Sequence, residues 1–129
     1  MVRSVLMAAV LTVVAAAPAL AQDAKAGEKD FLVCRACHQI GPGAHNAVGP
    51  VLNGVVGRHS GVYPGYDYSA ANKNSGIVWT KAELTKYLAN PQKVVPGTKM
   101  IFPGIKNPQQ VKDVIAYLEQ YGADGQPKK

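Results

Sequence analysis

Cys34, Cys37 and His38 form the sequence C-x-x-C-H, and their chemistry is the most specific feature of this chain. The two thiols are spaced to add to the two vinyl groups of one haem, which gives two thioether bonds. The imidazole of His38 follows directly and is placed to bind the iron from the same side. The motif therefore predicts one covalently attached haem c, with the opposite axial position of the iron still to be assigned.

Three other readings of the cysteine pair are open on the motif alone. Cys34 and Cys37 are the only cysteines, and in an oxidising compartment they could form a disulfide, although its small loop would stabilise the fold little. A redox-active dithiol is the second reading. A zinc site is the third, with His45 as a further ligand, but structural zinc sites usually have a second clustered pair. His38 directly after the pair, in a chain with an export signal, favours haem over all three.

The first residues have the pattern of a cleaved secretion signal. Arg3 supplies a positive charge, residues 5–17 form an apolar run of signal-peptide length, and Ala19-Leu20-Ala21 is an A-x-A cleavage site. A membrane anchor is the alternative, but the apolar run is short for a span. Cleavage after Ala21 makes residues 1–21 the signal peptide and releases residues 22–129 into the periplasm as one small domain. These 108 residues hold no second apolar run of membrane-spanning length, so we expect no stable membrane insertion.

The mature chain carries thirteen Lys and Arg residues against eight Asp and Glu residues, a formal charge of +5. A basic surface suits nucleic acid, a membrane or an acidic protein. The chain has no long basic block and no nucleic-acid motif, which favours an acidic protein partner. Scattered lysines that only keep the protein in solution are the simpler alternative.

Three segments have the pattern of helices, and no segment shows sustained strand alternation. We expect helices over residues 23–34, 80–89 and 107–121, and a frayed polar tail at 122–129. More than 40 residues rich in Gly, Asn and Ser separate the first two helices, which is unusual in a compact domain. A haem would give this irregular chain an apolar body to pack around, so the sequence predicts an all-α fold built on its cofactor.

The expected helix ends rest on specific capping residues. Asp23 is placed to cap the first helix. Thr80 and Glu83 have capping-box spacing at the start of the second, which Asn90-Pro91 should stop. Asn107 and Gln110 have the same spacing at the third.

Met100 is the only methionine left after removal of the leader, and it is the leading candidate for the sixth iron ligand. It follows Pro96-Gly97-Thr98-Lys99, whose two breakers stiffen the loop that would hold a weak thioether ligand. A lone methionine is otherwise often a filler of core gaps. His45 and His59 are rival ligands, but both lie in polar, Gly-rich stretches, and we expect them at the surface. A His/Met iron has no open position, which predicts one-electron transfer at positive potential rather than catalysis.

The sequence resembles the cytochrome c family, in particular the small bacterial cytochromes c2 and mitochondrial cytochrome c, over essentially the whole mature chain. The matching strings, in order, are Cys34 to His38, Val48-Gly49-Pro50, Gly57-Arg58, residues 65–69, 71–74 and 76–79, Asn90-Pro91, residues 95–102, and residues 115–118. The resemblance implies a small cytochrome c fold with three main helices, short helical turns and Ω-type loops around one haem. It also implies an electron carrier rather than an enzyme.

The resemblance implies a role for several residues around that haem. The carbonyl of Pro50 should accept the Nδ1 proton of His38 and orient its ring. The residues expected to satisfy a partly buried propionate are Arg58, Tyr68 and Trp79. The polar cluster expected beside the methionine sulfur is Asn72, Tyr87 and Thr98. Phe102 should shield the haem edge, and Gly27 and Tyr117 should lie at the contact where the first and last helices cross, with glycine allowing a close approach. Ordinary packing or capping is the alternative for each of these residues.

Partner docking is the last role that the resemblance implies. The lysines expected to belong to a ring around the exposed haem edge are Lys93, Lys99 and Lys106. The positions where relatives often carry lysine and this chain does not are Val33, Ala47 and Gln92. The ring is thinner here, and its attraction for acidic partners should weaken in salt.

By resemblance, the expected protein is a monomeric periplasmic carrier. It would take electrons from a cytochrome bc complex and deliver them to a photosynthetic reaction centre, a terminal oxidase or both. An electron acceptor for a periplasmic dehydrogenase, such as one that oxidises methanol, is an alternative. A haem enzyme or gas sensor would need an open sixth position, and a thiol oxidoreductase would be colourless.

Overall fold

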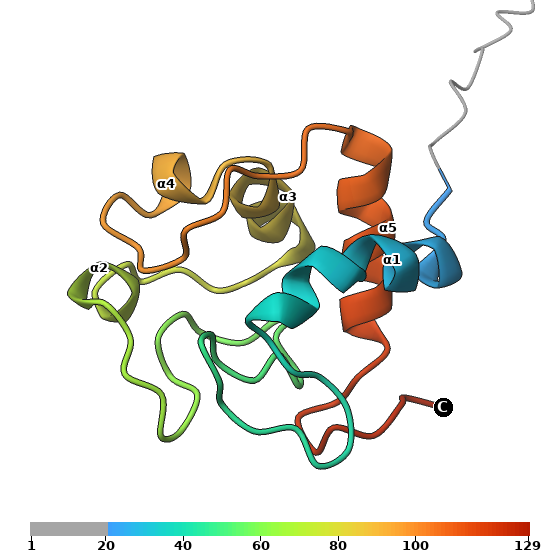
Figure 1. Cartoon of the computed structure of the whole chain (residues 1–129), viewed down its shortest axis with the longest axis horizontal. Coiled ribbons are helices and arrows are strands. Elements are labelled where there is room, and N and C mark those ends of the chain that lie inside the picture. The colour runs from blue at the N-terminus through green and yellow to red at the C-terminus, as the bar shows by residue number, and fades with distance from the viewer. Residues whose placement is uncertain (1–20) are drawn as a thin grey trace, which may run out of the picture.

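The computed structural model describes residues 21–129, so the predicted leader lies outside the described residues except for Ala21. Within this range the regular elements are helices. Two isolated β-bridges, His59–Val78 and Tyr121–Pro127, pair residues outside them. The elements are α1 (Ala24–Asp30), η1 (Phe31–Ala36, a 3-10 helix), α2 (Ala70–Lys73), α3 (Lys81–Ala89), α4 (Pro91–Val94) and α5 (Pro108–Glu119). The predicted all-α architecture is confirmed, and Figure 1 shows α3 and α5 above the long irregular segment that follows η1.

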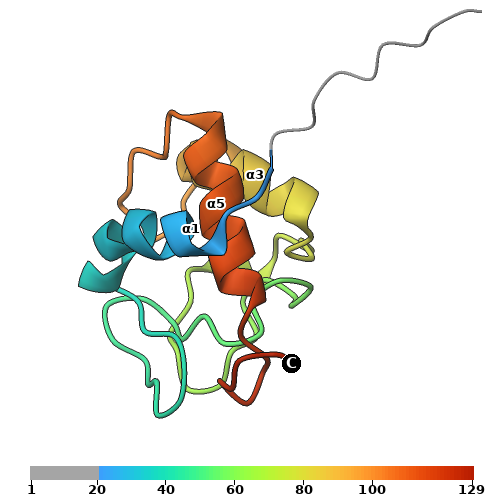
Figure 2. The ribbon, with the colours of Figure 1, turned by 90° about the vertical axis from the view of Figure 1, so that its right-hand side faces the viewer.

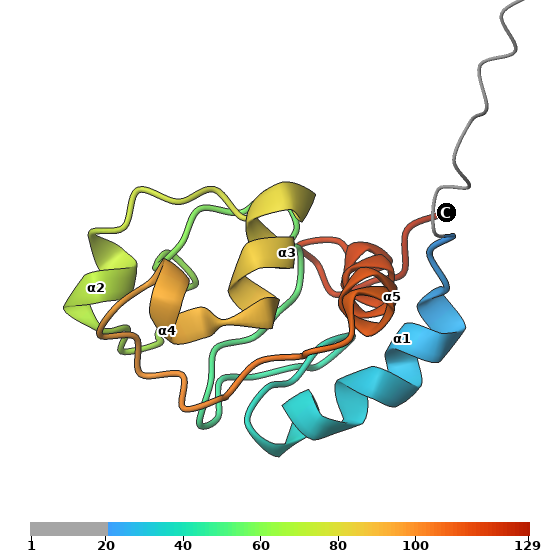
Figure 3. The same cartoon turned by 90° about the horizontal axis from the view of Figure 1, so that it is seen from above.

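The first predicted helix is in fact two helices in series. Asp23 caps α1, and its Oδ1 accepts hydrogen bonds of 3.0 Å from the N–H groups of Lys25 and Ala26. The chain then tightens at Phe31 into η1, whose geometry aligns side chains three residues apart. Figure 3 shows α1 and η1 as one curved rod along the outside of α5.

α1 and α5 cross each other, as Figure 2 shows. A Cβ atom on Gly27 would lie 1.8 Å from the carbonyl oxygen of Asp113, so the two backbones touch at this point. The predicted close approach of the first and last helices at Gly27 is therefore present, and the atoms nearest to a Cβ on Gly27 belong to the backbone of Asp113 and Val114. Tyr117 lies one turn further along α5 and packs on Phe31, with 5.2 Å between ring centroids.

Asp113 ties the start of α1 to α5. Asp113 is 6% exposed, and its Oδ1 accepts hydrogen bonds of 2.9 Å from the N–H of Asp23 and from Nε2 of Gln109. Gln110 reaches across the same crossing to Asp30 (3.1 Å) instead of back to the cap, where we expected it. The α5 cap is Asn107 alone, whose Oδ1 accepts from the N–H of Gln109 at 2.9 Å.

The second predicted helix begins and ends where expected. Oγ1 of Thr80 accepts the N–H of Glu83 at 3.2 Å, but Glu83 pairs with Lys86 (2.9 Å), so only half of the capping box forms. Asn90 ends α3, and its side chain caps α4 by accepting the N–H of Lys93 at 3.2 Å. The helix stop at Asn90-Pro91 is therefore also a helix start, and α4 carries the chain toward Met100.

One core joins the helices to the loops. Its buried members are Phe31, Val55, Trp79, Leu84, Tyr87, Leu88, Val95, Val111, Val114, Ile115, Tyr117 and Leu118. Each large apolar side chain of this kind contributes about 1.5–3 kcal/mol when fully buried. Cys34 and Met100 are half-buried against the same cluster, so the core reaches the two segments that matter for the site.

The long segment after η1 is held by its own polar side chains. Asn53 is buried, and its amide accepts from the N–H of Gly41 (2.7 Å) and donates to the oxygen of Gly41 (3.1 Å). The predicted fraying of residues 122–129 is wrong, because the N–H of Lys128 bonds to the oxygen of Gln120 at 2.6 Å. Buried Gly125 packs against the same part of the loop, so the tail closes over it.

Candidate functional site

The C-x-x-C-H segment closes into a tight turn at the end of η1. The N–H groups of Cys37 and His38 both bond to the oxygen of Cys34, at 3.1 and 2.9 Å. Residues three apart in a 3-10 helix lie one above the other, so this turn favours two thiols on one face. Both cysteines are half-buried, and no disulfide joins them.

The thiol of Cys34 is unlike that of a redox-active dithiol. Burial, and to a smaller extent the neighbouring Cys37, raise its pKa from an ordinary 9.0 to about 11. Thiol oxidoreductases depend instead on a cysteine whose pKa is lowered, because the thiolate is the nucleophile. With its raised pKa, Cys34 thus lacks the activation that such an enzyme needs at its nucleophilic cysteine.

The ring of His38 is held in one orientation by a backbone carbonyl. Its Nδ1 lies 2.7 Å from the carbonyl oxygen of Pro50, which can only accept, so Nδ1 carries the proton and Nε2 keeps a free lone pair. Burial lowers the pKa of His38, with the Pro50 contact opposing this shift and Arg58 adding to it. A Cβ on Gly49 would lie 2.5–2.9 Å from three ring atoms of His38, so glycine is needed beneath the ring.

Met100 lies in a loop between α4 and α5 that polar contacts hold in place. Its N–H donates to Oγ1 of Thr98 at 3.2 Å, and its carbonyl oxygen accepts from Nε2 of Gln92 at 3.2 Å. Figures 2 and 3 both show this orange segment on the same side of the molecule as η1, which carries Cys34. The two segments expected to face one haem thus share one side of the fold.

The polar cluster predicted beside Met100 is assembled. The hydroxyls of Tyr87 and Thr98 lie 3.3 Å apart in the core. Burial raises the pKa of Tyr87, and hydrogen bonds with Thr98 and Asn72 oppose that shift. Asn72 in α2 also donates to Oγ of Ser60 at 3.4 Å, so the cluster links α2, α3 and the Met100 loop.

Arg58 is the best test of whether the residues fit a haem. Nη1 donates to the oxygen of Asn53 and Nη2 to that of Val51, each at 3.0 Å. Among residues 21–129, Nε of Arg58 is the one buried side-chain nitrogen or oxygen without a hydrogen-bond partner. Both acceptors of the guanidinium are backbone carbonyls rather than carboxylates, and burial lowers the pKa of Arg58. A half-buried guanidinium with a buried, unpaired Nε suits an anionic group such as a haem propionate, so the residues present fit the cofactor.

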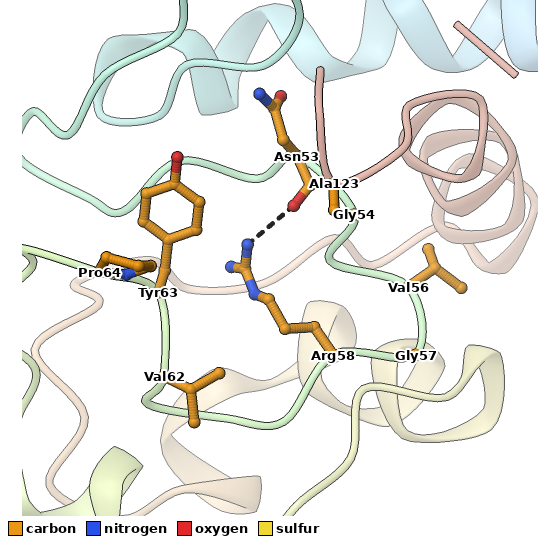
Figure 4. A pocket seen from close by; sticks show the side chains of 9 residues that line it. All are labelled: Asn53, Gly54, Val56, Gly57, Arg58, Val62, Tyr63, Pro64 and Ala123. Atoms are coloured by element: carbon orange, nitrogen blue, oxygen red, sulfur yellow. Dashed lines mark hydrogen bonds between the residues drawn. The ribbon is translucent and has the colours of Figure 1, made fainter. Parts of the chain in front are cut away.

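A cavity of about 590 Å³ opens beside Arg58, as Figure 4 shows. The ring of Tyr63 lies over the guanidinium, 5.1 Å from Cζ to the ring centroid. The lining residues are Asn53, Gly54, Val56, Gly57, Arg58, Val62, Tyr63, Pro64 and Ala123. Because neither Cys34, His38 nor Met100 lines it, this cavity is not the site of the haem ring, although it adjoins the residue expected to hold a propionate.

The other residues predicted to contact the haem make contacts that ordinary packing also explains. Trp79 is buried and packs on Tyr87, with 4.5 Å between ring centroids, which serves the core as well as a cofactor. The hydroxyl of Tyr68 accepts the N–H of Tyr63 at 3.2 Å, and burial raises its pKa. Phe102 is half-buried, next to an Ile101 that is 97% exposed.

Two of the three predicted docking lysines are engaged within the chain. Lys99 pairs with the carboxylate of Asp67 at 3.1 Å and also donates to the Asp67 carbonyl. Lys106 donates to the oxygens of Pro103 (2.8 Å) and Ala89 (3.4 Å). Lys93 is exposed on α4, and no side-chain hydrogen bond of it is found in the described part of the chain.

The rival ligands do not form a second centre. His45 and His59 are both exposed, as predicted. Within residues 21–129 no three His, Cys, Asp or Glu side chains are grouped to hold a metal ion, so the zinc reading has no support. None of the described helices has the length and apolar character needed to span a bilayer.

Comparison with known proteins decides the family, because the family model for cytochrome c matches residues 24–122. The chain belongs to the cytochrome c family. Cytochrome c2 of Blastochloris viridis is 58% identical over 112 residues, which are 87% of this chain and 88% of the relative. The solved structure of cytochrome cH from Methylobacterium extorquens is 52% identical, with a TM-score of 0.72, and covers 76% of this chain and 98% of its own. Cytochrome c2 of Rhodospirillum centenum is 38% identical with a TM-score of 0.74, covering 78% and 98%.

These likenesses confirm three sequence predictions. The fold is the helical cytochrome c fold, and the chain groups with the class I cytochromes c2. Its cofactor is one covalently attached haem c, for which the two cysteines of the C-x-x-C-H motif are present. Its activity is that of a c-type cytochrome electron carrier and not of an enzyme.

Two residues of the site were missed at the sequence level. Gly49 was noted only as part of a matching string, although a glycine next to the predicted acceptor Pro50 signals a close approach. Gln92 was noted only as a missing lysine, whereas its amide bonds to the Met100 loop. No spacing rule reveals that contact, because it depends on how α4 is turned toward the loop.

Proposed function

We propose that this cytochrome holds its haem iron between His38 and Met100, and its porphyrin through Cys34 and Cys37, and works as a periplasmic one-electron carrier. Bound haem supplies a one-electron iron couple. The observation that carries the ligand assignment is the 2.7 Å contact between Nδ1 of His38 and the oxygen of Pro50. This hydrogen bond fixes the tautomer of His38, so that Nε2 carries the lone pair, and it holds the ring in one orientation.

The way in which Met100 is held supports its role as the second iron ligand. Its backbone is held at both the N–H and the carbonyl, so the thioether has a fixed starting point. A soft sulfur ligand favours ferrous iron and raises the reduction potential. With both axial positions held by side chains, no position is left for dioxygen or substrate, which suits transfer of an electron and nothing else.

Arg58, Tyr68 and Trp79 are proposed to hold a propionate, and Asn72, Tyr87 and Thr98 to tune the sulfur. The buried Nε of Arg58, which has no hydrogen-bond partner among residues 21–129, supports the first assignment. The hydroxyl pair of Tyr87 and Thr98, bonded in turn to the N–H of Met100, supports the second. Phe102 is proposed to cover the haem edge beside exposed Ile101.

An optical spectrum tests the ligand pair. We expect the oxidised protein to show the weak long-wavelength band of a methionine–iron bond, and the reduced protein not to bind carbon monoxide readily. A high-spin reduced protein that binds carbon monoxide at once would overturn the proposal, because it would show an open axial position.

We propose further that residues 1–21 are removed on export and that the carrier operates between membrane redox complexes. The chemistry expected is uptake from a cytochrome bc complex and delivery to a photosynthetic reaction centre or terminal oxidase, as the resemblance to cytochromes c2 suggests. The mass of protein purified from the periplasm tests the first part, because processing after Ala21 gives a chain that begins at Gln22.

Charge reversal at Lys93 tests acidic docking. Because Lys93 is exposed and free of the internal contacts that hold Lys99 and Lys106, Lys93→Glu should slow the reaction with an acidic partner complex about three- to tenfold at ~10 mM salt. The difference should nearly vanish at ~0.5 M salt, since the Debye length then falls to about 4 Å. Stopped-flow kinetics at both ionic strengths measure it.

A matched reversal, Lys128→Glu, changes the net charge equally at the C-terminal end, which Figures 1 and 3 place far from α4. We expect a much smaller effect from it. Equal slowing by the two variants would show that only net charge matters, and slowing of Lys93→Glu that persists in high salt would exclude steering.

A further inference from the structure

Gln92 makes two contacts that no motif predicts. It lies in the short helix α4, exposed to solvent. Its Nε2 donates to the carbonyl oxygen of Thr98 at 3.3 Å and to that of Met100 at 3.2 Å. One amide group therefore bridges two carbonyls of the loop that carries the proposed iron ligand.

Apart from the packing of Met100 on the core and the hydroxyl pair of Thr98 and Tyr87, the other contacts of this part of the loop are local or exposed. Gly97 turns the chain with a φ of 88°, and the N–H of Thr98 closes the turn on the oxygen of Val95 at 3.0 Å. Beyond Met100, Ile101 is 97% exposed and adds no packing. The pair of Lys99 with fully exposed Asp67 crosses to another loop, and such surface ion pairs hold little.

The backbone of Met100 is thus bonded at two points. Its N–H is taken by Thr98, whose hydroxyl belongs to the buried cluster with Tyr87. Its carbonyl is taken by Gln92, which belongs to α4. The first contact lies within the loop, and the hydroxyl pair of Thr98 and Tyr87 connects it to α3. The second joins the loop to a neighbouring helix, so it resists movement of Met100 away from its place.

We propose that Gln92 is a positioning residue for Met100, which holds the loop closed so that the thioether stays on the iron. This inference rests on the proposed role of Met100 as axial ligand. It also gives Gln92 a role at a position where we expected only the loss of a docking lysine. Where relatives often carry a lysine charge, this chain has the amide of Gln92, which bonds to the loop that carries Met100.

The consequence is measurable as competition for the iron. An added ligand such as imidazole reaches the sixth position only when the Met100 loop opens, so its apparent affinity is scaled by the open population. Removal of contacts that exist only in the closed loop raises that population. Loss of two exposed hydrogen bonds should increase the imidazole affinity about three- to tenfold.

The experiment compares the oxidised holoprotein with Gln92→Leu and with the matched control Gln110→Leu. Gln110 is also an exposed glutamine with a side-chain hydrogen bond, but its partner is Asp30 at the crossing of α1 and α5. We expect tighter imidazole binding and a weaker methionine–iron band for Gln92→Leu alone. Thermal unfolding of both variants measures the global effect, which should be similar in the two.

A second variant, Gln92→Glu, keeps the shape but places an acceptor against two carbonyls, and should raise imidazole affinity at least as much. Unchanged affinity in both Gln92 variants would overturn the inference while leaving Met100 as ligand. An equal change in Gln110→Leu would also overturn it, because the effect would then follow overall stability. A parent protein without the methionine–iron band would overturn this inference and the proposed ligand pair together.

Discussion

Replacement of Met100 by alanine is expected to lower the reduction potential by on the order of 0.2 V, a quarter of the ~0.8 V range that haem axial ligands span. The thioether favours ferrous iron, and water or hydroxide in its place would favour ferric iron. The same change should open the iron, so that the reduced protein binds carbon monoxide. A redox titration followed through the visible bands measures the first effect, and a carbon monoxide titration the second.

The neighbouring variant Ile101→Ala is the control for Met100→Ala. Ile101 is 97% exposed, so its loss removes a side chain from the same loop without removing a buried contact. We expect its potential and ligand band to match those of the parent. An unchanged potential in Met100→Ala would exclude Met100 as ligand and leave His45 and His59, both exposed, as the residues to test.

The helices could be predicted because their signals are local. The caps Asp23, Thr80 and Asn107 all accept backbone N–H groups as their side-chain chemistry predicts. The inward face of α5 follows from apolar spacing, and its valine, isoleucine and leucine positions are buried. Such features depend on contacts within one turn, so they need no knowledge of the rest of the chain.

The errors concern contacts between distant segments. Residues 122–129 read as a frayed tail because they are polar, but Gly125 fits against Gly41 and Asn53, where a Cβ would lie 2.6 Å from either partner. Gln110 could reach its own cap or Asp30, and the crossing of α1 and α5 decides for Asp30. Polarity and spacing do not separate these outcomes, because each depends on where another part of the chain passes.

In the site, too, the local features could be predicted from the sequence and one contact between segments could not. The C-x-x-C-H motif names its chemistry directly, since three residues in five carry it. The placement of Pro50 behind His38, and of Thr98 beside Tyr87, agrees with what the family resemblance implied. The roles of these residues toward the haem remain predictions. The contact of Gln92 with the Met100 loop could come only from the structure.

Gly27→Ala is expected to destabilise the protein by about 3 kcal/mol, the upper end of the usual cost of overpacking. Taken alone, alanine should stabilise α1, because it is favoured over glycine inside a helix by about 1 kcal/mol. The new Cβ, however, would lie 1.8 Å from the oxygen, 2.4 Å from the carbonyl carbon of Asp113 and 2.9 Å from the nitrogen of Val114. These are backbone atoms of α5, so the clash can be relieved only by moving one helix away from the other.

The cost should extend beyond the crossing itself. Separation of α1 from α5 would stretch the contact of Asp113 with the N–H of Asp23, which is now 2.9 Å, and loosen Tyr117 against Phe31. Phe31 begins η1, and η1 carries Cys34, so the strain should reach the haem-attachment turn. Guanidinium unfolding of the oxidised holoprotein measures the free energy lost.

Gly122→Ala is the matched control for the helix crossing. Gly122 does not have a positive φ, and the nearest atom to its Cβ would be Oδ1 of Asp124 at 3.0 Å, at the end of an exposed side chain that can shift at the cost of at most its exposed bond from the N–H of Gln126. We expect its free energy of unfolding to stay within about 1 kcal/mol of the parent, as for most surface substitutions. If Gly27→Ala were as stable as the parent, the helix-propensity gain would outweigh the contact, and the close approach of α1 and α5 could not be what holds the attachment segment in place.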